Sequence, residues 1–121
     1  MYKVEFIKQV HSSCSAVSSN DVFLRINKEL PFLPQTGMSF VLSLVTAHNK
    51  KVEFVDLEIN SDDVVEVSYW EKDNTIKVYL KSDKKFYELA SESKNFISYE
   101  PPKKEWKAHI KEYIDAGWEV R

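Results

Sequence analysis

His11 and Cys14 form a His-x-x-Cys pair, whose side chains could bind a metal or act as a nucleophile and its base. Imidazole and thiolate are zinc ligands, and a nearby imidazole can also activate a cysteine nucleophile. A zinc site needs three or four protein ligands, and the remaining histidines, His48 and His109, lie far along the chain. For a cysteine nucleophile, Asp21 is the candidate that would orient the histidine. We predict no metal site, no cofactor and no catalytic residue.

Carboxylates are concentrated in the middle of the chain. Residues 52–71 contain seven acids and no lysine or arginine, whereas residues 72–111 contain ten lysines against six acids. Clustered like charges steer partners of opposite sign, although the same acids can also be a solvated sheet face that meets lysines of the next strand. We interpret the acidic stretch and two hairpin aromatics as a surface for a protein partner. The candidate partner-binding residues are Glu53, Asp56, Glu58, Asp62, Asp63, Glu66, Trp70 and Tyr79.

Glycine is scarce, with Gly37 and Gly117 the only two in 121 residues. Loops that cradle phosphates need several glycines for tight turns and for close approach of the backbone. The chain therefore lacks the means to build a Walker loop or a dinucleotide-binding turn, which excludes most nucleotide-dependent enzymes.

Two further functions are alternatives to protein binding. Trp70 and Tyr79 lie near Lys77 and Lys81, a faint version of the aromatic and basic sheet face that binds single-stranded nucleic acid. The net charge of −2 disfavours this, because phosphate neutralisation supplies most of the affinity. The second alternative is a small-ligand-binding protein or enzyme with a pocket between sheet and C-terminal helix, lined by Trp70, Tyr79 or Trp106.

Composition predicts a single domain over residues 1–121. The length matches the commonest domain size, and 43% hydrophobic and 13% aromatic residues supply ample core material. The single cysteine gives no internal disulfide, and the N-terminus alternates charged with apolar residues, unlike a signal peptide. We expect a cytoplasmic protein that does not enter the membrane and that can form homo-oligomers.

Alternation of polar and apolar residues, the period of half-buried strands, dominates the first 80 residues. It predicts strands over residues 2–10, 22–27, 38–46 and 51–59, with a serine-rich loop at 11–21 and a turn at 48–50. Residues 64–80 predict a hairpin that turns at 72–74, with Trp70 and Tyr79 on the face opposite its aliphatic residues. That second face is predicted to be covered by the C-terminal helix or used for binding.

Helical periodicity is confined to the C-terminal part of the chain. Trp106, Ile110, Tyr113 and Ile114 fall on one stripe, so we predict a helix over about residues 102–116, followed by Gly117 in the left-handed position. Residues 85–90 fit either a short strand or a helical turn. Residues 96–99 are predicted as a further strand.

The sequence resembles small single-domain bacterial and phage proteins that carry a Pro-Phe-x-Pro-x-x-Gly corner before a valine-rich hairpin. Here the corner is Pro31-Phe-Leu-Pro-Gln-Thr-Gly37 and the hairpin is Val65–Leu80, so the resemblance covers roughly residues 22–82. The similar proteins usually continue with Asp after the glycine, where this chain has Met38. The resemblance implies a small domain and brings no activity with it.

These patterns together predict an α+β fold: a small, strongly bent antiparallel sheet or partly open β-barrel of about six strands, with one C-terminal helix. The function that fits best is a non-enzymatic protein-binding module. Such a module would be an adaptor, or an inhibitor or immunity-type protein of a bacterium or mobile element.

Overall fold

The computed structural model describes residues 1–15, 20–48 and 51–121, and these contain seven strands and two α-helices. Parts of the expected loop at 11–21 and turn at 48–50 therefore lie outside the described residues. The strands are β1 (Tyr2–Val10), β2 (Val22–Leu30), β3 (Phe40–His48), β4 (Lys51–Ile59), β5 (Val64–Trp70), β6 (Thr75–Leu80) and β7 (Glu119–Val120). The helices are the 3-10 turn η1 (Glu71–Asp73), α1 (Lys85–Ser91) and α2 (Lys103–Asp115).

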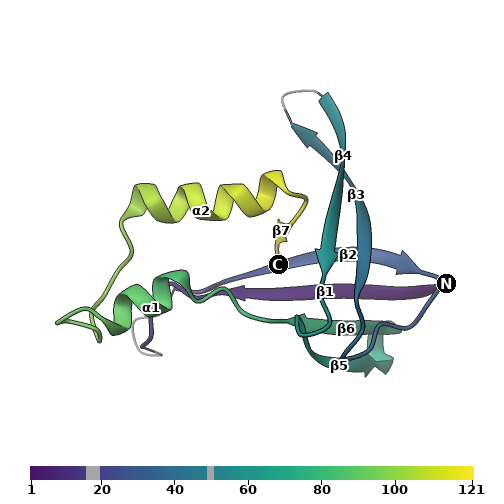
Figure 1. Cartoon of the computed structure of the whole chain (residues 1–121), viewed down its shortest axis with the longest axis horizontal. Coiled ribbons are helices and arrows are strands. Elements are labelled where there is room, and N and C mark those ends of the chain that lie inside the picture. The colour runs from purple at the N-terminus through teal and green to yellow at the C-terminus, as the bar shows by residue number, and fades with distance from the viewer. Residues whose placement is uncertain (16–19, 49–50) are drawn as a thin grey trace.

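Five of the strands form one sheet in the order β5-β6-β1-β2-β7 (Figure 1). Strand β1 pairs antiparallel with β2 over its whole length and parallel with β6 from Val4 to Ile7. The parallel pairing is possible because the chain between β1 and β6 is long enough to cross over. Within that crossover lie β2, β3, β4 and β5.

The other two strands, β3 and β4, pair only with each other among the described residues, as a two-stranded ribbon that we call the arm (residues 40–59). The arm crosses the sheet and extends beyond it (Figure 1). Its base is anchored by Phe40, whose ring lies 5.9 Å from that of Phe6 and 5.4 Å from that of Phe32. This anchoring matters because a two-stranded ribbon alone is at best marginally stable in water.

The core lies between the arm base and the face of the five-stranded sheet that we call the front face. The alternation of each strand sends every second side chain to this face. The buried core residues from the sheet are Val4, Phe6, Val10, Leu24, Ile26, Leu30, Val64, Ile76, Val78 and Leu80. From the opposite side, Leu42, Leu44, Ile59 and Trp118 close the core.

Helix α2 ends in a Schellman motif that places Trp118 in the core. The Trp118 N–H donates to the Tyr113 carbonyl at 3.0 Å, and the Gly117 N–H donates to the Ile114 carbonyl at 3.1 Å. Gly117 has φ +105°, and a Cβ there would meet Leu44 Cδ1 at 3.0 Å. The glycine is therefore required both by its dihedral angle and by the arm that packs on it. The predicted helix end and the glycine position are confirmed.

The α+β class is confirmed, but several details of the predicted architecture were wrong. The five-stranded sheet is open, because β5 and β7 are edge strands among the described residues, and it is mixed because β1 and β6 run parallel. Residues 85–91 form helix α1, a second helix, since Phe86 and Ala90 repeat at helical spacing and are buried. Residues 96–98 form a turn and a bend, and residue 99 has no regular structure, so the strand predicted at 96–99 is absent. In the described part of the chain, neither helix has the length and apolarity needed to cross a membrane.

Candidate functional site

The eight residues predicted to bind a partner lie in three places. Glu53, Asp56 and Glu58 are on β4 of the arm. Asp62 and Asp63 are in the turn between β4 and β5. The remaining three, Glu66, Trp70 and Tyr79, lie on the face of the five-stranded sheet opposite the core, which we call the back face. The structure therefore does not bring the eight residues together into one surface.

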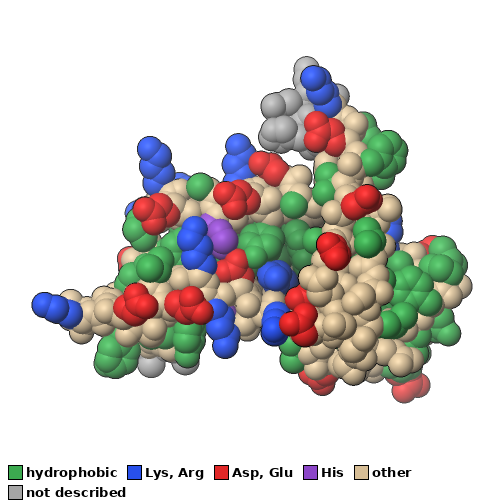
Figure 2. Space-filling model, in the orientation of Figure 1, with side chains coloured by type: hydrophobic (Ala, Val, Ile, Leu, Met, Phe, Trp, Pro, Cys, Tyr) green, Lys and Arg blue, Asp and Glu red, His purple; other side chains and the backbone are tan. Residues whose placement is uncertain are grey.

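The outer face of the arm, the face turned away from the core, is apolar near the tip. In the β3–β4 register, Val45 lies opposite Phe54, and Val52 precedes them on the same face. Phe54 is 82% exposed, Val52 66% and Val45 64%. Figure 2 shows hydrophobic side chains on the projecting arm with acidic side chains beside them. A patch of large apolar side chains rimmed by polar ones marks an interaction site more often than a single exposed residue does.

Two acids continue the outer face of the arm toward its base. Asp56 lies opposite Ser43, whose hydroxyl donates to it at 3.4 Å, and Glu58 lies opposite Val41. Glu53 lies on the other face of β4 but is also exposed. None of these three carboxylates forms an ion pair with another described residue. The outer face of the arm therefore presents apolar area and unpaired negative charge together.

The acids of the turn have local structural roles. The Asp63 carboxylate accepts the Asn60 N–H at 2.8 Å and so closes the turn between β4 and β5. Asp62 lies 3.5 Å from the ammonium group of Lys81, with both side chains mostly exposed. These two residues stabilise the turn and its neighbour strand, so the acidic stretch is divided between a structural turn and an exposed arm.

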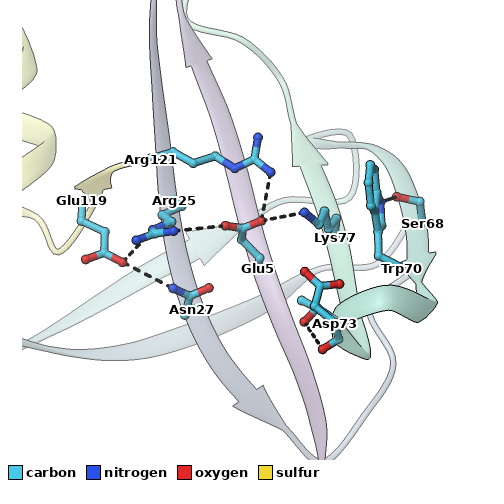
Figure 3. Close-up of polar contacts among 10 residues, drawn as sticks. Glu5, Arg25, Asn27, Ser68, Trp70, Asp73, Lys77, Glu119 and Arg121 are labelled. Carbon is cyan, nitrogen blue, oxygen red and sulfur yellow. Dashed lines mark hydrogen bonds and ion pairs between the residues drawn. The ribbon is translucent and has the colours of Figure 1, made fainter.

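The back face is organised around a buried carboxylate that sequence reasoning missed (Figure 3). The side chains of Glu5 and Lys77 are each only 9% exposed, and Glu5 Oε1 lies 3.6 Å from Lys77 Nζ. Arg121 reaches the same oxygen at 3.4 Å, and Arg25 lies 3.9 Å from the other oxygen. Arg25 also pairs with Glu119 at 3.0 Å. The alternation of β1 predicted Glu5 to face away from the core. Only the pairing of β1 with β2 and β6, and of β2 with β7, brings Arg25, Lys77 and Arg121 to it.

Trp70 and Tyr79 share the back face, as the hairpin pattern predicted, and neither helix covers them. The Lys77 ammonium group lies 4.3 Å from the Trp70 ring centroid, and the Trp70 indole N–H donates to Ser68 Oγ at 3.0 Å. Lys77 is thus engaged by both Glu5 and Trp70, and Lys81 is engaged by Asp62. Of the two lysines on which the nucleic-acid alternative rests, Lys77 is therefore buried and engaged within the protein, whereas Lys81 is mostly exposed.

A third polar cluster joins α2 to the sheet. Asp83, just after β6, accepts hydrogen bonds from the Tyr113 hydroxyl and from the Lys85 N–H at 3.0 Å, and lies 2.8 Å from His109 Nε2. Burial raises the pKa of Asp83, but these hydrogen bonds and the nearby His109 outweigh burial, and the pKa is lowered. Burial and the Asp83 carboxylate together raise the pKa of Tyr113. The cluster stabilises the attachment of α2.

The His-x-x-Cys segment is organised by Asp21, as the sequence suggested. Asp21 Oδ2 lies 3.1 Å from His11 Nδ1, and its other oxygen accepts the Ser12 N–H at 2.8 Å. The Cys14 thiol instead contacts the Phe96 carbonyl at 3.9 Å. Within residues 1–15, 20–48 and 51–121, no three histidine, cysteine or acidic side chains converge as metal ligands do.

An open groove of about 440 Å³ runs beside α2. Trp106, Ile110 and Ile114 of the helix form one wall and Val22 of β2 contributes to the other. The groove lies between helix and sheet, and Trp106 lines it. Trp70 and Tyr79 are not in it, because they lie on the back face of the sheet.

Comparisons of the chain with protein-family models, with curated proteins and with solved structures found no match.

Proposed function

We propose that this chain is a non-enzymatic protein-binding module and that the arm is its recognition element. The observation that carries the proposal is the outer face of the arm, where Val45, Val52 and Phe54 are all more than half exposed. A soluble chain gains nothing in its own folding from large apolar side chains that stay in water. Their burial by a partner supplies the missing driving force.

The energy available from this patch sets the size of the contact. Burying each of the three side chains is worth roughly 1.5–3 kcal/mol, so together they contribute at most about 9 kcal/mol. Association itself costs roughly 4–15 kcal/mol in lost freedom of motion. The gain from the apolar patch falls within the range of that cost and leaves little surplus, so a contact that extends to the neighbouring acids or strand edges of the arm is favoured.

The edges of the arm favour an extended contact. Strand β4 pairs only with β3 among the described residues, so its outer backbone groups are available to a further strand. One carbonyl of β3, that of Ser43, already accepts a hydrogen bond from Lys28 of β2. A lysine at a strand edge hinders further pairing, so β4 is the edge that favours strand addition.

Charge then defines the chemistry of the partner. Asp56 and Glu58 continue the outer face, and Glu53 flanks it, all without a cation from the described chain. A partner surface that is apolar at its centre and basic at its rim complements this arrangement. An adaptor, or an inhibitor or immunity-type protein of a bacterium or mobile element, needs a surface of this kind.

A photo-reactive phenylalanine analogue at position 54, introduced into the protein in its native host, tests the proposal. We expect irradiation to give a discrete covalent adduct to a protein. Asp56→Lys with Glu58→Lys in the same chain should reduce the yield of that adduct at least several-fold, because the basic rim of the partner is then repelled.

Tyr69 is the matched control position, since it is also an exposed aromatic but lies on β5, away from the arm. The same analogue at position 69 should give no discrete adduct. Equal adducts from both positions, or none from position 54, would overturn the proposal that the arm is the recognition element.

A further inference from the structure

The groove beside α2 is apolar like the outer face of the arm but carries lysines where the arm carries carboxylates. Its walls are apolar, and Ile114 is exposed in it. Lys107 and Lys111, one helical turn apart, line it as well. Neither lysine forms an ion pair with the described residues. Asp115 lines the groove beyond Ile114, so the groove combines apolar area with two lysines and one carboxylate, a net positive charge.

The repeat distances of the groove and the arm match. Along α2, side chains four residues apart rise by about 6 Å, so Trp106, Ile110 and Ile114 span about 12 Å. Along β4, side chains two residues apart rise by about 6.6 Å, so Val52, Phe54 and Asp56 span about 13 Å. Successive side chains on one face of the strand can therefore meet successive turns of the helix.

We propose that the partner of the arm is a second copy of this chain, whose α2 groove receives the outer face of the arm. The inference rests on the proposed role of the arm. Phe54 and Val52 pack against Trp106 and Ile110, while Asp56 and Glu58 face the lysines that line the groove. The two complementary surfaces, the outer face of the arm and the α2 groove, are both present in this one chain.

Symmetry strengthens such a contact. In a two-fold dimer the arm of each copy enters the groove of the other, so every contact is made twice. Two patches of the size described above then act together, and the doubled contact comes closer to the roughly 800 Å² per partner of a stable interface. In Figure 1 the arm and α2 are separate features of one molecule, and Phe54 of the arm and Ile114 of the groove are both exposed.

The test is the mass of the purified chain alone, measured by sedimentation across a wide concentration range. We expect a concentration-dependent dimer that weakens at high salt, since ion pairs between exposed side chains are screened. Two charge-reversed variants sharpen the measurement. Asp56→Lys with Glu58→Lys alters the arm, and Lys107→Glu with Lys111→Glu alters the groove. Each variant should be monomeric when alone.

Mixing the two variants should restore the dimer, because the basic arm of the first meets the acidic groove of the second and the reverse pair keeps its original charges. A merely misfolded variant would not recover in this way. Glu71→Lys with Asp73→Lys, on the exposed turn η1, is the control for charge alone and should dimerise like the unchanged chain.

A purified chain that stays monomeric at every concentration would overturn the inference, as would a mixture of the two variants that stays monomeric. The two experiments distinguish failure of this inference from failure of the proposed function. An adduct from position 54 to a different protein, with a monomeric purified chain, removes the self-association and leaves the arm as recognition element. An absence of any adduct removes both.

Discussion

The outer face of the arm and the back face of the sheet are both exposed strand surfaces with acids and aromatics, yet they differ in what those side chains contact. On the back face, Glu5 is surrounded by three cations and Trp70 lies against Lys77. On the arm, Phe54 is largely in water and Glu58 has no cation among the described residues.

The difference follows from the number of neighbouring strands. The back face spans five strands, so a charged side chain on one of the three inner strands has cross-strand neighbours on both sides that can carry the opposite charge. The arm has two strands, and each residue has a neighbour on one side only. The back face, whose charges are paired within the chain, stabilises the fold. The outer face of the arm, whose charges and apolar side chains lack such partners among the described residues, is free to contact another molecule.

Glu5→Ala should have the largest effect on stability. It leaves Lys77 buried without its carboxylate, and breaking a buried pair in this way costs about 3–5 kcal/mol in free energy of unfolding. Denaturant unfolding measures the loss. Glu119→Ala is the matched control, because Glu119 is an exposed partner of Arg25, and it should cost less than about 1 kcal/mol. Equal losses from both variants would show that the back face is not a buried network.

Asp83→Asn extends the comparison to the carboxylate that holds α2. Loss of a charged hydrogen-bond acceptor should cost about 1.5–3 kcal/mol at neutral pH. The folded pKa of Asp83 is lowered, so its contribution is present above the unfolded value of about 3.9 and is lost as the pH falls through the folded pKa. The stability gap between the two proteins should therefore shrink below about pH 4. A gap that stays constant from pH 7 to the acid limit would contradict the assignment.

Gly117→Ala tests the contact between the end of α2 and the arm. The position has φ +105°, and the added methyl group would press on Leu44 of β3, so a loss of roughly 1–2 kcal/mol is expected. Gly37→Ala is a useful reference, since it shares a positive φ but has open space around it. Thermal melts that fall by the same amount in both variants would mean that contact with the arm adds nothing.

Phe54→Ser should have the smallest effect on folding and the clearest effect on binding. Surface substitutions that break no contact usually change stability by less than about 0.5 kcal/mol, and Phe54 is 82% exposed. Association through the arm should nevertheless be lost. A melting midpoint that falls as far as for Glu5→Ala would show that Phe54 is part of the core, and the contrast between the two surfaces would fail.

Local patterns predicted much of the secondary structure because it depends on neighbours in sequence. Residues 2–10 and 51–59 form strands with the predicted bounds, and Gly117 ends α2 as expected. Residues 96–99 were wrongly predicted as a strand, since Phe96 and Ile97 are apolar but exposed. For residues 85–90 the helix prevailed because tertiary contacts bury Phe86, against which Trp106 packs at 5.3 Å between ring centroids.

Only part of the candidate site could be predicted, because local patterns show which residues are acidic but tertiary contacts decide which of them lie together. The acids of β4 could be recognised from composition, but their separation from Asp62, Asp63 and the back face depends on where each strand pairs. Phe54 is not among the residues predicted from the sequence, because an apolar residue in a strand is ordinarily interpreted as part of the core. The signal was present in the alternation, which places Phe54 on the same face as Asp56 and opposite to Leu57.

The sequence by itself determined which segments become strands and helices, since periodicity, turn residues and helix ends act over a few residues. The tertiary structure alone decided that β1 pairs with β6 across some 70 residues, that Glu5 gathers its three cations, and that β3 and β4 leave the sheet as an arm. Those outcomes depend on packing between distant segments, where the free energy of the whole core selects one register among many that local sequence allows.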